Sequence, residues 1–450
     1  MIRFVPSDRS QVFLLPPDLR DWVPEDDLAH FIAEAAARVD LQAFKVNARG
    51  TGSAQYDPRM MLALLIYCYA NGIFSSRRIE RATRFDVRMR FLSANTHPDH
   101  DTIATFRREN FEAFSKAFLQ VLELAKELKI LKVGTISVDG TKMNANANIH
   151  KSIRYDRAVE LREQLQNEIA ELVKKAETAD AAPDKIDHAL PDEISRRRDL
   201  KAKMELAIAR LEAQAKTRAA TEQEDYEKRK QNHDDSNGSG RPPQPPSAVP
   251  RPEEQTNLTD ADSRIMRKNK RSEYRQAYNP QIGVDADGTQ LILGAGVSQS
   301  ASDANELVPI VDAVTKAVGA PITVLADTGY ENGEAVAELE SRNIEVLVAV
   351  RGSAHRRPHD FRPTMPEKKV VEPKSPWMKK MKEKLATDAG KAEYKKRKKT
   401  VEPVFGIIKH GMGFRQFLLR GIAKVTGEWN LVALAYNCRR LHTLVLAQAA

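Results

Sequence analysis

The chain has 450 residues, of which 41% are hydrophobic and 30% are charged, and its formal net charge of +9 favours a polyanionic partner. Its first residues lack the pattern of a signal peptide, and no run reaches the roughly 18 apolar residues that a membrane span needs, so we expect a cytoplasmic chain without a membrane partner. The two cysteines, Cys68 and Cys438, stand in apolar surroundings without CxxC spacing, which argues against a disulfide framework or a zinc site.

Helical patterns fill residues 1–130. An apolar helix is predicted over Met60–Asn71, a second helical stretch over Ser75–Leu92 carries arginines around apolar positions, and a third begins at Asp101-Thr102 as its N-cap. Short arginine-rich helices are typical of a helix-turn-helix unit, although ordinary helical packing produces the same pattern.

A short β-rich run over Val133–Asp139 follows. Residues 152–231 are charged and helical, which predicts a two-helix hairpin with a narrow apolar seam, and Asn232–Pro252 reads as a linker rich in Gly, Pro and Ser. The hairpin is structural or pairs with another chain. Its apolar stripes are Leu161, Leu165, Ile169 and Leu172, then Leu200, Met204, Ile208 and Leu211.

The strand pattern resumes at Tyr278. Two strand-like runs, Gln281–Asp285 and Gln290–Val297, flank Asp287-Gly288, a dipeptide typical of hairpin turns. Helix and strand patterns then alternate, which predicts a mixed α/β sheet interrupted by residues 140–277. The later predicted elements are helix Leu307–Val318, strand Ile322–Ala326, helix Gly333–Arg342, strand Ile344–Val350 and helix Tyr394–His410.

Positive charge is concentrated late in the chain. The stretch Glu367–Lys399 holds 13 Lys and Arg against 5 Asp and Glu. It either contacts a DNA backbone or forms a solvated tether.

Three acids form the candidate site. Asp139 and Asp327 each follow an apolar strand, and the carboxyl ends of such strands are where α/β proteins usually place their sites, whereas Glu402 lies on the late helix. Carboxylates brought close together repel one another unless a hard cation such as Mg²⁺ binds them. Two such ions, about 4 Å apart, support in-line attack on a phosphodiester. Spacing alone is also compatible with acids that cap helices or pair with lysines.

Longer motifs narrow the choice of function for these acids. The motifs resemble those of bacterial insertion-sequence transposases of the Asp-Asp-Glu class, in particular the group numbered eleven-eighty-two. The N-terminal helical region of that group is similar to residues 56–112. The motifs are SVDGTKMNANAN (137–148), TDADSRIM (259–266), YNPQIGVD (278–285), VLADTGYENGE (324–334) and YKKRKKTVEPVFGIIKHGMGFRQFLLRG (394–421).

The resemblance covers almost the whole chain except the charged hairpin and the linker. It implies an α/β fold with a ribonuclease H-like mixed sheet core and a helical N-terminal domain, and the charged helical hairpin predicted above is inserted into that core. The resemblance assigns the first, second and third catalytic and metal-binding acids to Asp139, Asp327 and Glu402. The implied domains are 1–130 (helical, DNA-binding), 131–150 (first core strand with Asp139), 151–257 (hairpin and linker) and 258–450 (the remaining core).

The family's third acid belongs to a tyrosine, arginine, glutamate, lysine signature, which matches Tyr394, Arg397, Glu402 and Lys409. Four residues separate Arg397 from Glu402, where the family often has three, and Lys398 has the commoner spacing. Arg397 and Lys398 therefore both remain candidates for the basic member. Tyr394 and Lys409 would bind the DNA end, while Tyr278, Asn279 and Gln281 would shape the site.

The implied function is DNA transposition. Two Mg²⁺ ions per site, with Mn²⁺ as a substitute, would support cleavage at the ends of the element and joining of the 3′-hydroxyl ends to target DNA. The expected partners are the terminal inverted repeats, the target DNA and further copies of the chain in a homodimer or higher synaptic complex. The expected location is the bacterial cytoplasm, in association with the nucleoid.

Other functions remain open from the sequence. A related nuclease or resolvase would use the same metals without joining strands, and a non-enzymatic DNA-binding protein would bind without cleavage. Asp327-Thr328-Gly329 also occurs in aspartic proteases, but those enzymes pair two such motifs, and here the motif leads from a strand into a helix.

Overall fold

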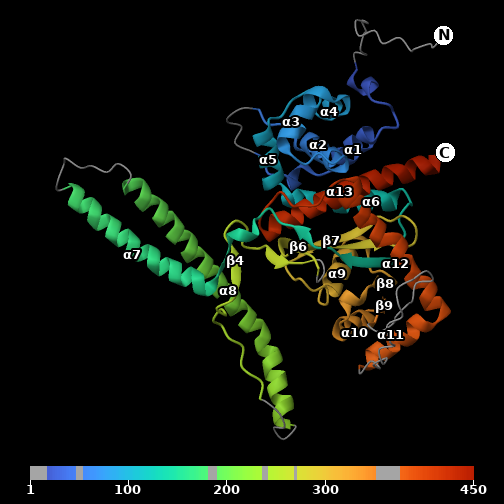
Figure 1. The fold of residues 1–450 in the computed structure, drawn as a ribbon. Coiled ribbons are helices and arrows are strands. Elements are labelled where there is room, and N and C mark those ends of the chain that lie inside the picture. Colours follow the sequence, from blue (N-terminus) through green and yellow to red (C-terminus); the bar gives the residue numbers. More distant parts are fainter. Residues whose placement is uncertain are drawn as a thin grey trace, which may run out of the picture. The chain divides into compact units, whose positions relative to one another are not determined.

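The computed structural model describes residues 18–46, 54–180, 190–235, 242–267, 271–350 and 375–449 (Figure 1). The chain divides into two compact units, and the second is an insertion into the first. Unit 1 comprises Met1–Met143, Asn279–Leu419 and Ala423–Ala450, and unit 2 comprises Asn144–Tyr278 with Arg420–Ile422.

Unit 1 begins with short helices, as the sequence predicts. Asp57 caps α2 by accepting hydrogen bonds from the N–H groups of Arg59 and Met60, and Pro58 occupies its first turn. Residues 61–70 of this helix are all buried, so α2 is the centre of the helical region. The elements are η1 (Leu19–Trp22), α1 (Leu28–Ala37), η2 (Leu41–Ala43), α2 (Pro58–Ala70), α3 (Ser76–Phe85), α4 (Val87–Leu92), α5 (His100–Glu109) and α6 (Phe111–Glu127).

Two helix boundaries in this region differ from the sequence prediction. The stretch Ser75–Leu92 is not continuous, because Asp86 leaves the helical conformation and caps α4. The prediction of Asp101-Thr102 as an N-cap is wrong, since Asp99 caps α5 and accepts a hydrogen bond from Thr102 N–H. In both cases a short acidic side chain satisfies helix N–H groups from outside the helix, which ends or starts it at that residue.

The core of unit 1 is a mixed sheet in the order β7-β6-β1-β8-β9. β7, β6 and β1 are antiparallel neighbours, whereas β1, β8 and β9 are parallel, so the predicted ribonuclease H-like α/β fold is confirmed. The short strands β2 (Met143–Asn144) and β5 (Arg264–Met266) also pair with β6. The main strands are β1 (Thr135–Gly140), β6 (Arg275–Asp285), β7 (Ile292–Ser298), β8 (Thr323–Ala326) and β9 (Glu345–Val348).

Helices cover this sheet, which explains why its central strands are apolar on both faces. Ile136, Ser137 and Val138 of β1 are fully buried. Around the sheet, α9 packs against β7, α10 and α11 against β9, and α12 against β1 and β8 (Figure 1). These helices are α9 (Leu307–Val318), α10 (Gly333–Ser341), α11 (Pro376–Ala386) and α12 (Asp388–Gly406).

The long C-terminal helix α13 (Ile422–Ala449) was not predicted from the sequence. Trp429 is fully buried, and its indole N–H donates to the carbonyl of Gln281 in β6 (3.1 Å). Asn437 hydrogen-bonds both backbone groups of Ile292 in β7. Although α13 is largely apolar, none of the helices in the described part of the chain is long and apolar enough to span a membrane.

Unit 2 contains the predicted hairpin, formed by α7 (Tyr155–Asp180) and α8 (Leu190–Asp235). At its base, β3 (Ser152–Arg154) pairs antiparallel with β4 (Gln255–Asn257). Leu200 is 40% exposed and does not join the seam as predicted. Residues 232–235 of the predicted linker belong to α8 instead. The seam includes Ile153, Ala158, Leu165, Met204, Ala207 and Ile208.

Candidate active site

Asp139 and Asp327 lie side by side at the carboxyl ends of neighbouring parallel strands. β1 and β8 pair in register up to Ser137 opposite Leu325. Two residues further along each extended chain, the same register sets Asp139 opposite Asp327. Because side chains two residues apart share a face of the sheet, the two carboxylates project in the same direction.

Both aspartates are held in the same way. Oδ1 of Asp139 accepts from Gly140 N–H, and Oδ1 of Asp327 accepts from Gly329 N–H, each at 2.8 Å. The free Oδ2 atoms face Nη2 of Arg397, at 3.0 Å from Asp139 and 3.6 Å from Asp327. A Cβ atom at Gly329 would lie 2.9 Å from Oδ1 of Asp327, so a larger residue there would displace this carboxylate. One oxygen of each carboxylate therefore orients the group, and the other faces the site.

The third acid comes from α12. Nη1 of Arg397 lies 3.6 Å from Oε1 of Glu402, whose side chain is 57% exposed. Pro403 follows directly and has no N–H to bond the carbonyl of Lys399, four residues earlier. That carbonyl instead accepts a hydrogen bond from Nε2 of Gln290 (2.7 Å). Glu402 thus stands at the solvent edge of the site, on a helical turn that is supported from outside the helix.

Salt bridges and hydrogen bonds fix the position of α12 against the sheet. Glu393 accepts a hydrogen bond from the hydroxyl of Thr135 at the start of β1 (2.7 Å). Lys396 forms ion pairs with Glu393 and with Asp287 of the β6–β7 turn. These contacts hold one turn of α12 on β1, so Arg397 faces the carboxyl ends of the strands.

Arg397 is the centre of the acidic cluster. Its guanidinium contacts all three acids, it is buried, and its Nε has no hydrogen-bond partner within the described structure. Burial is the main cause that raises the pKa of Asp139 to about 6; the charge of Arg397 opposes this rise, and that of Asp327 adds to it. Among the described residues, no three His, Cys, Asp or Glu side chains stand in a geometry that could hold a metal ion. The cation between the acids in this arrangement is Arg397.

The remaining residues of the signature lie around this cluster. The hydroxyl of Tyr394 donates to the carbonyl of Ala326 (3.2 Å), the last residue of β8. Lys409, in the π-turn after α12, donates to the hydroxyl of Thr141. Lys398 is exposed, unlike its neighbour Arg397. Of the two candidates for the basic member, Arg397 faces the acids and Lys398 faces solvent.

Two family models match the chain. The Transposase DDE domain matches residues 247–438, and the Transposase domain (DUF772) matches residues 17–109. The chain belongs to the DDE-type insertion-sequence transposases. No curated protein and no solved structure matches it. The match to the first model starts after Asp139, which the register of β1 and β8 nevertheless sets beside Asp327.

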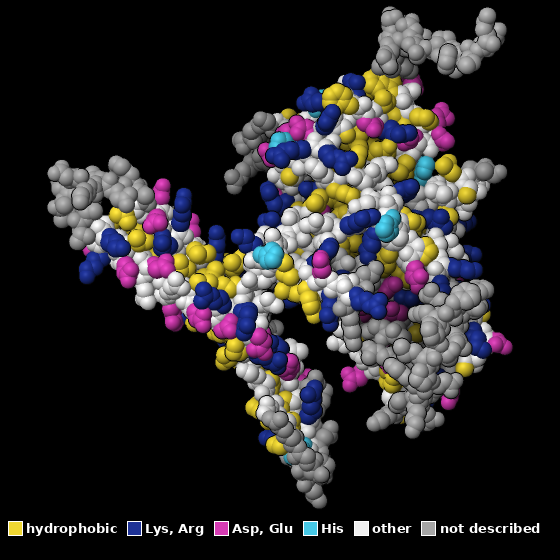
Figure 2. All heavy atoms as spheres, viewed as in Figure 1, with side chains coloured by type: hydrophobic (Ala, Val, Ile, Leu, Met, Phe, Trp, Pro, Cys, Tyr) yellow, Lys and Arg dark blue, Asp and Glu magenta, His cyan; other side chains and the backbone are white. Residues whose placement is uncertain are grey.

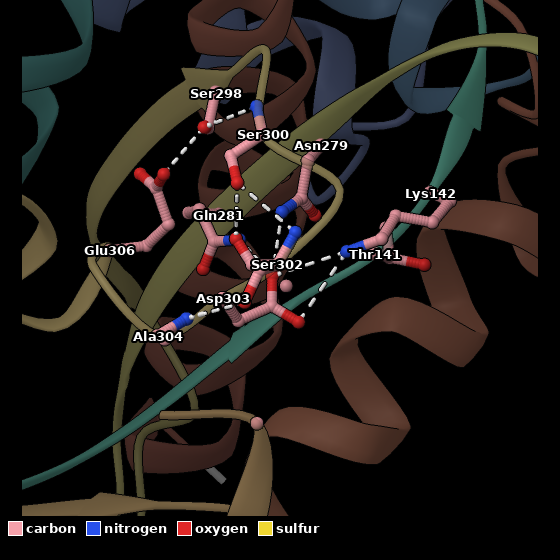
Figure 3. Close-up of polar contacts among 12 residues, drawn as sticks. Thr141, Lys142, Asn279, Gln281, Ser298, Ser300, Ser302, Asp303, Ala304 and Glu306 are labelled. Carbon is pink, nitrogen blue, oxygen red and sulfur yellow. Dashed lines mark hydrogen bonds and ion pairs between the residues drawn. The ribbon is translucent and has the colours of Figure 1, made fainter. Parts of the chain in front are cut away.

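A fourth carboxylate of the transposase, Asp303, lies close enough to Asp139 for its charge to help raise the pKa of that acid. Figure 3 shows Asp303 among Asn279, Gln281 and Lys142. Its Oδ1 accepts hydrogen bonds from Asn279 (2.6 Å) and Gln281 (2.9 Å), and Lys142 forms an ion pair with it at 3.3 Å. Gln281 in turn accepts from the buried hydroxyl of Tyr330. Asp303 thereby links β6, the turn after β1 and, through Gln281, the turn after Asp327.

Sequence reasoning missed Asp303 and Lys142 in the transposase. Asp303 follows a serine-rich turn instead of a predicted strand, so no strand-end pattern singled it out. The available signal was indirect. Asn279 and Gln281 are two residues apart on β6, so their amides share one buried face and each requires a hydrogen-bond partner there.

Proposed function

We propose that this transposase cleaves DNA at the ends of its insertion sequence and joins the 3′-hydroxyl ends to target DNA, with Asp139, Asp327 and Glu402 as its catalytic and metal-binding residues. One observation carries the proposal: carboxylates from two parallel strands and from α12 converge on a single guanidinium, within 3.0, 3.6 and 3.6 Å. Three acids around one buried positive charge leave an excess of negative charge that divalent cations would neutralise.

By its chemistry the donor set suits Mg²⁺, with Mn²⁺ as a substitute, because every donor is a carboxylate oxygen. Two ions would bind once the three acids draw closer together than they stand around Arg397. Asp139, Asp327 and Glu402 would hold these ions. When bound, such ions activate the attacking oxygen and stabilise the leaving oxygen of a phosphodiester. Before they bind, Arg397 holds the acids together by neutralising part of their charge.

Other side chains of the chain have supporting roles in this proposal. Tyr394 fixes the end of β8 through the Ala326 carbonyl and borders the DNA end. Lys409 and exposed Lys398 neutralise phosphates, which makes binding dependent on salt. The N-terminal helices and the basic stretch bind the terminal inverted repeats. Glu402, at the solvent edge of the site, faces the bound DNA. Since two ends are joined, the working form is a homodimer or higher synaptic complex, associated with the nucleoid.

Cleavage of a DNA fragment that carries an element end tests this proposal. In the presence of Mg²⁺, we expect Asp139→Asn, Asp327→Asn and Glu402→Gln each to lose at least about a hundredfold in rate, while the exposed control Glu112→Gln keeps full activity. Equal activity of all variants would refute the assignment. A 3′-hydroxyl end supplied with a target plasmid separates the alternatives, because a nuclease yields cuts without joined products.

A further inference from the structure

We propose that the outward face of α3, formed by Arg77, Arg78, Arg81 and Arg84, binds the phosphate backbone of duplex DNA. This arginine face belongs to unit 1. The inference rests on the proposed function and deepens it, because it names the surface that holds the DNA and the part of the DNA that it contacts.

The arginine face is one side of an amphipathic helix. At about 100° per residue, Arg77, Arg81 and Arg84 fall within an arc of about 60°, and Arg78 extends this arc by a similar amount. All four side chains are exposed. Ile79 and Thr83 lie on the opposite side and are fully buried. The helix therefore separates an anchored face from a cationic face.

The anchored face makes α3 a fixed support. It packs against α4 and α5. The hydroxyl of Thr83 donates to the carbonyl of Glu80 (2.7 Å), and the ring of His97 lies within hydrogen-bond distance of the same hydroxyl. Arginines on such a helix need no large rearrangement of the backbone to meet a ligand.

The acidic side chain of α3 itself does not neutralise the arginine face. Glu80 is the acid of α3, and its carboxylate pairs with Nδ1 of His100 at 2.9 Å. Within the described part of the chain, the four arginines form no ion pair, and Figure 2 shows dark-blue basic side chains over this helix. Arg77 and Arg78 also lie in the first turn, which has no acid and where the helix dipole disfavours positive charge. The arrangement fits an external anion better than a role in helix stability.

An exposed aromatic ring orients part of this face. Phe85 is 77% exposed, and the guanidinium of Arg81, one turn earlier, stacks over its ring at 5.9 Å from the centroid. Cation–π stacking of this kind restricts the arginine without neutralising its charge. Phe85 thus favours positions of the Arg81 guanidinium over its ring.

The side chains of the arginine face are suited to contact the phosphate backbone of DNA, and less suited to recognise the edges of its bases. Guanidinium groups bind phosphate oxygens in a bidentate manner. The arc presents no Asn, Gln or acidic side chain, the groups that read adenine and cytosine edges. We therefore expect this contact to position DNA with little dependence on its sequence.

Fluorescence anisotropy of the full chain with labelled duplexes, in EDTA to prevent cleavage, tests the inference. One duplex carries an element end and a second has the same composition in scrambled order. The test variant is Arg77→Gln, Arg81→Gln, Arg84→Gln, and the matched control is Arg196→Gln, Arg198→Gln, Arg210→Gln on exposed positions of α8. Glutamine retains a good helix propensity, so both should fold, which circular dichroism checks.

For the α3 variant, we expect the slope of log affinity against log salt to fall by about 2 to 3, equally on both duplexes, and the affinity to fall at least about tenfold. The control should keep the wild-type slope. Arg84→Gln alone should lower the slope by about 1 and serves if the triple variant does not fold. An unchanged slope, an equal loss in the control, or a loss confined to the element end would each overturn the inference while leaving the proposed function intact. If the wild type binds neither duplex, the proposed function fails as well.

Discussion

The guanidinium of Arg397 lies 3.0 Å from the carboxylate of Asp139, closer than to either of the other two acids. This ion pair connects α12 with the end of β1. The same positive charge would compete with any divalent cation for the acids, so Arg397 should influence both the stability of the metal-free protein and its response to metal.

Replacement of Arg397 by Gln should destabilise the metal-free protein by about 1 to 2 kcal/mol, because it leaves Asp139, the least exposed of the three acids, without its counter-charge. Divalent cations should then recover more stability in the variant than in the wild type, since no guanidinium competes with them. Thermal melts with EDTA and with Mg²⁺ measure both effects. The neighbouring Lys398→Gln, at an exposed position, is the control and should melt like the wild type in both conditions. An identical Mg²⁺-induced increase in Tm in Arg397→Gln and wild type would contradict the prediction.

Asp139→Asn should stabilise the metal-free protein above about pH 6 and have little effect below about pH 4. The pKa of Asp139 is raised to about 6 from 3.8, so the folded state holds a proton that the unfolded chain releases between these values. The wild type therefore loses stability as pH rises through this window, by on the order of 2 kcal/mol, whereas the amide cannot titrate. Melts in EDTA across this pH range follow the difference in Tm. A difference that stays constant with pH would show that burial does not raise this pKa.

Glu428→Ala should lower the free energy of unfolding by about 3 kcal/mol or more. Glu428 is fully buried on α13 and accepts hydrogen bonds from the hydroxyl of Tyr69 and from the N–H groups of Leu418 and Leu419. Burial raises its pKa, and the nearby charge of Arg107 opposes that rise. Glu428→Gln keeps acceptor capacity and should lose less stability. Chemical denaturation compares the two. Equal losses would mean that the carboxylate itself, with its charge and its second acceptor oxygen, matters more than packing.

Asp303→Ala should slow DNA cleavage and lower stability by about 2 kcal/mol, because it removes the acceptor shared by Asn279 and Gln281 and the partner of Lys142. Asp303→Asn retains an acceptor oxygen and should lose less of both. Cleavage of end-containing DNA and thermal melts, measured on both variants, test the order. If Asp303→Asn is as impaired as Asp303→Ala, then the charge of Asp303 matters more than its acceptor geometry.

The sequence could predict the features that depend on local pattern. The apolar runs before Asp139 and Asp327 predicted strands that end at these acids, and the order of strands and helices predicted the fold class. The position of both acids on one face follows from a shared register, which requires only that the strands are neighbours. Those steps depend on periodicity and topology, and both can be read from one sequence.

The choice between Arg397 and Lys398 could not be made in this way. Adjacent residues on a helix point about 100° apart, so the answer depends on the rotation of α12 about its own axis. The ion pairs and hydrogen bonds of Glu393 and Lys396 with distant residues set that rotation. Likewise, the position of Asp303 depends on a serine-rich turn whose path no repeat pattern describes.

The antiparallel pairing of β3 with β4 brings the two ends of a long inserted segment next to each other. A segment that leaves and rejoins the chain at adjacent points can grow, shrink or be exchanged without stretching the polypeptide on either side. The number of residues between Asp139 and Asp327 is therefore free to vary during evolution. The distance between the two side chains is preserved, because the inserted segment does not interrupt the pairing of β1 with β8.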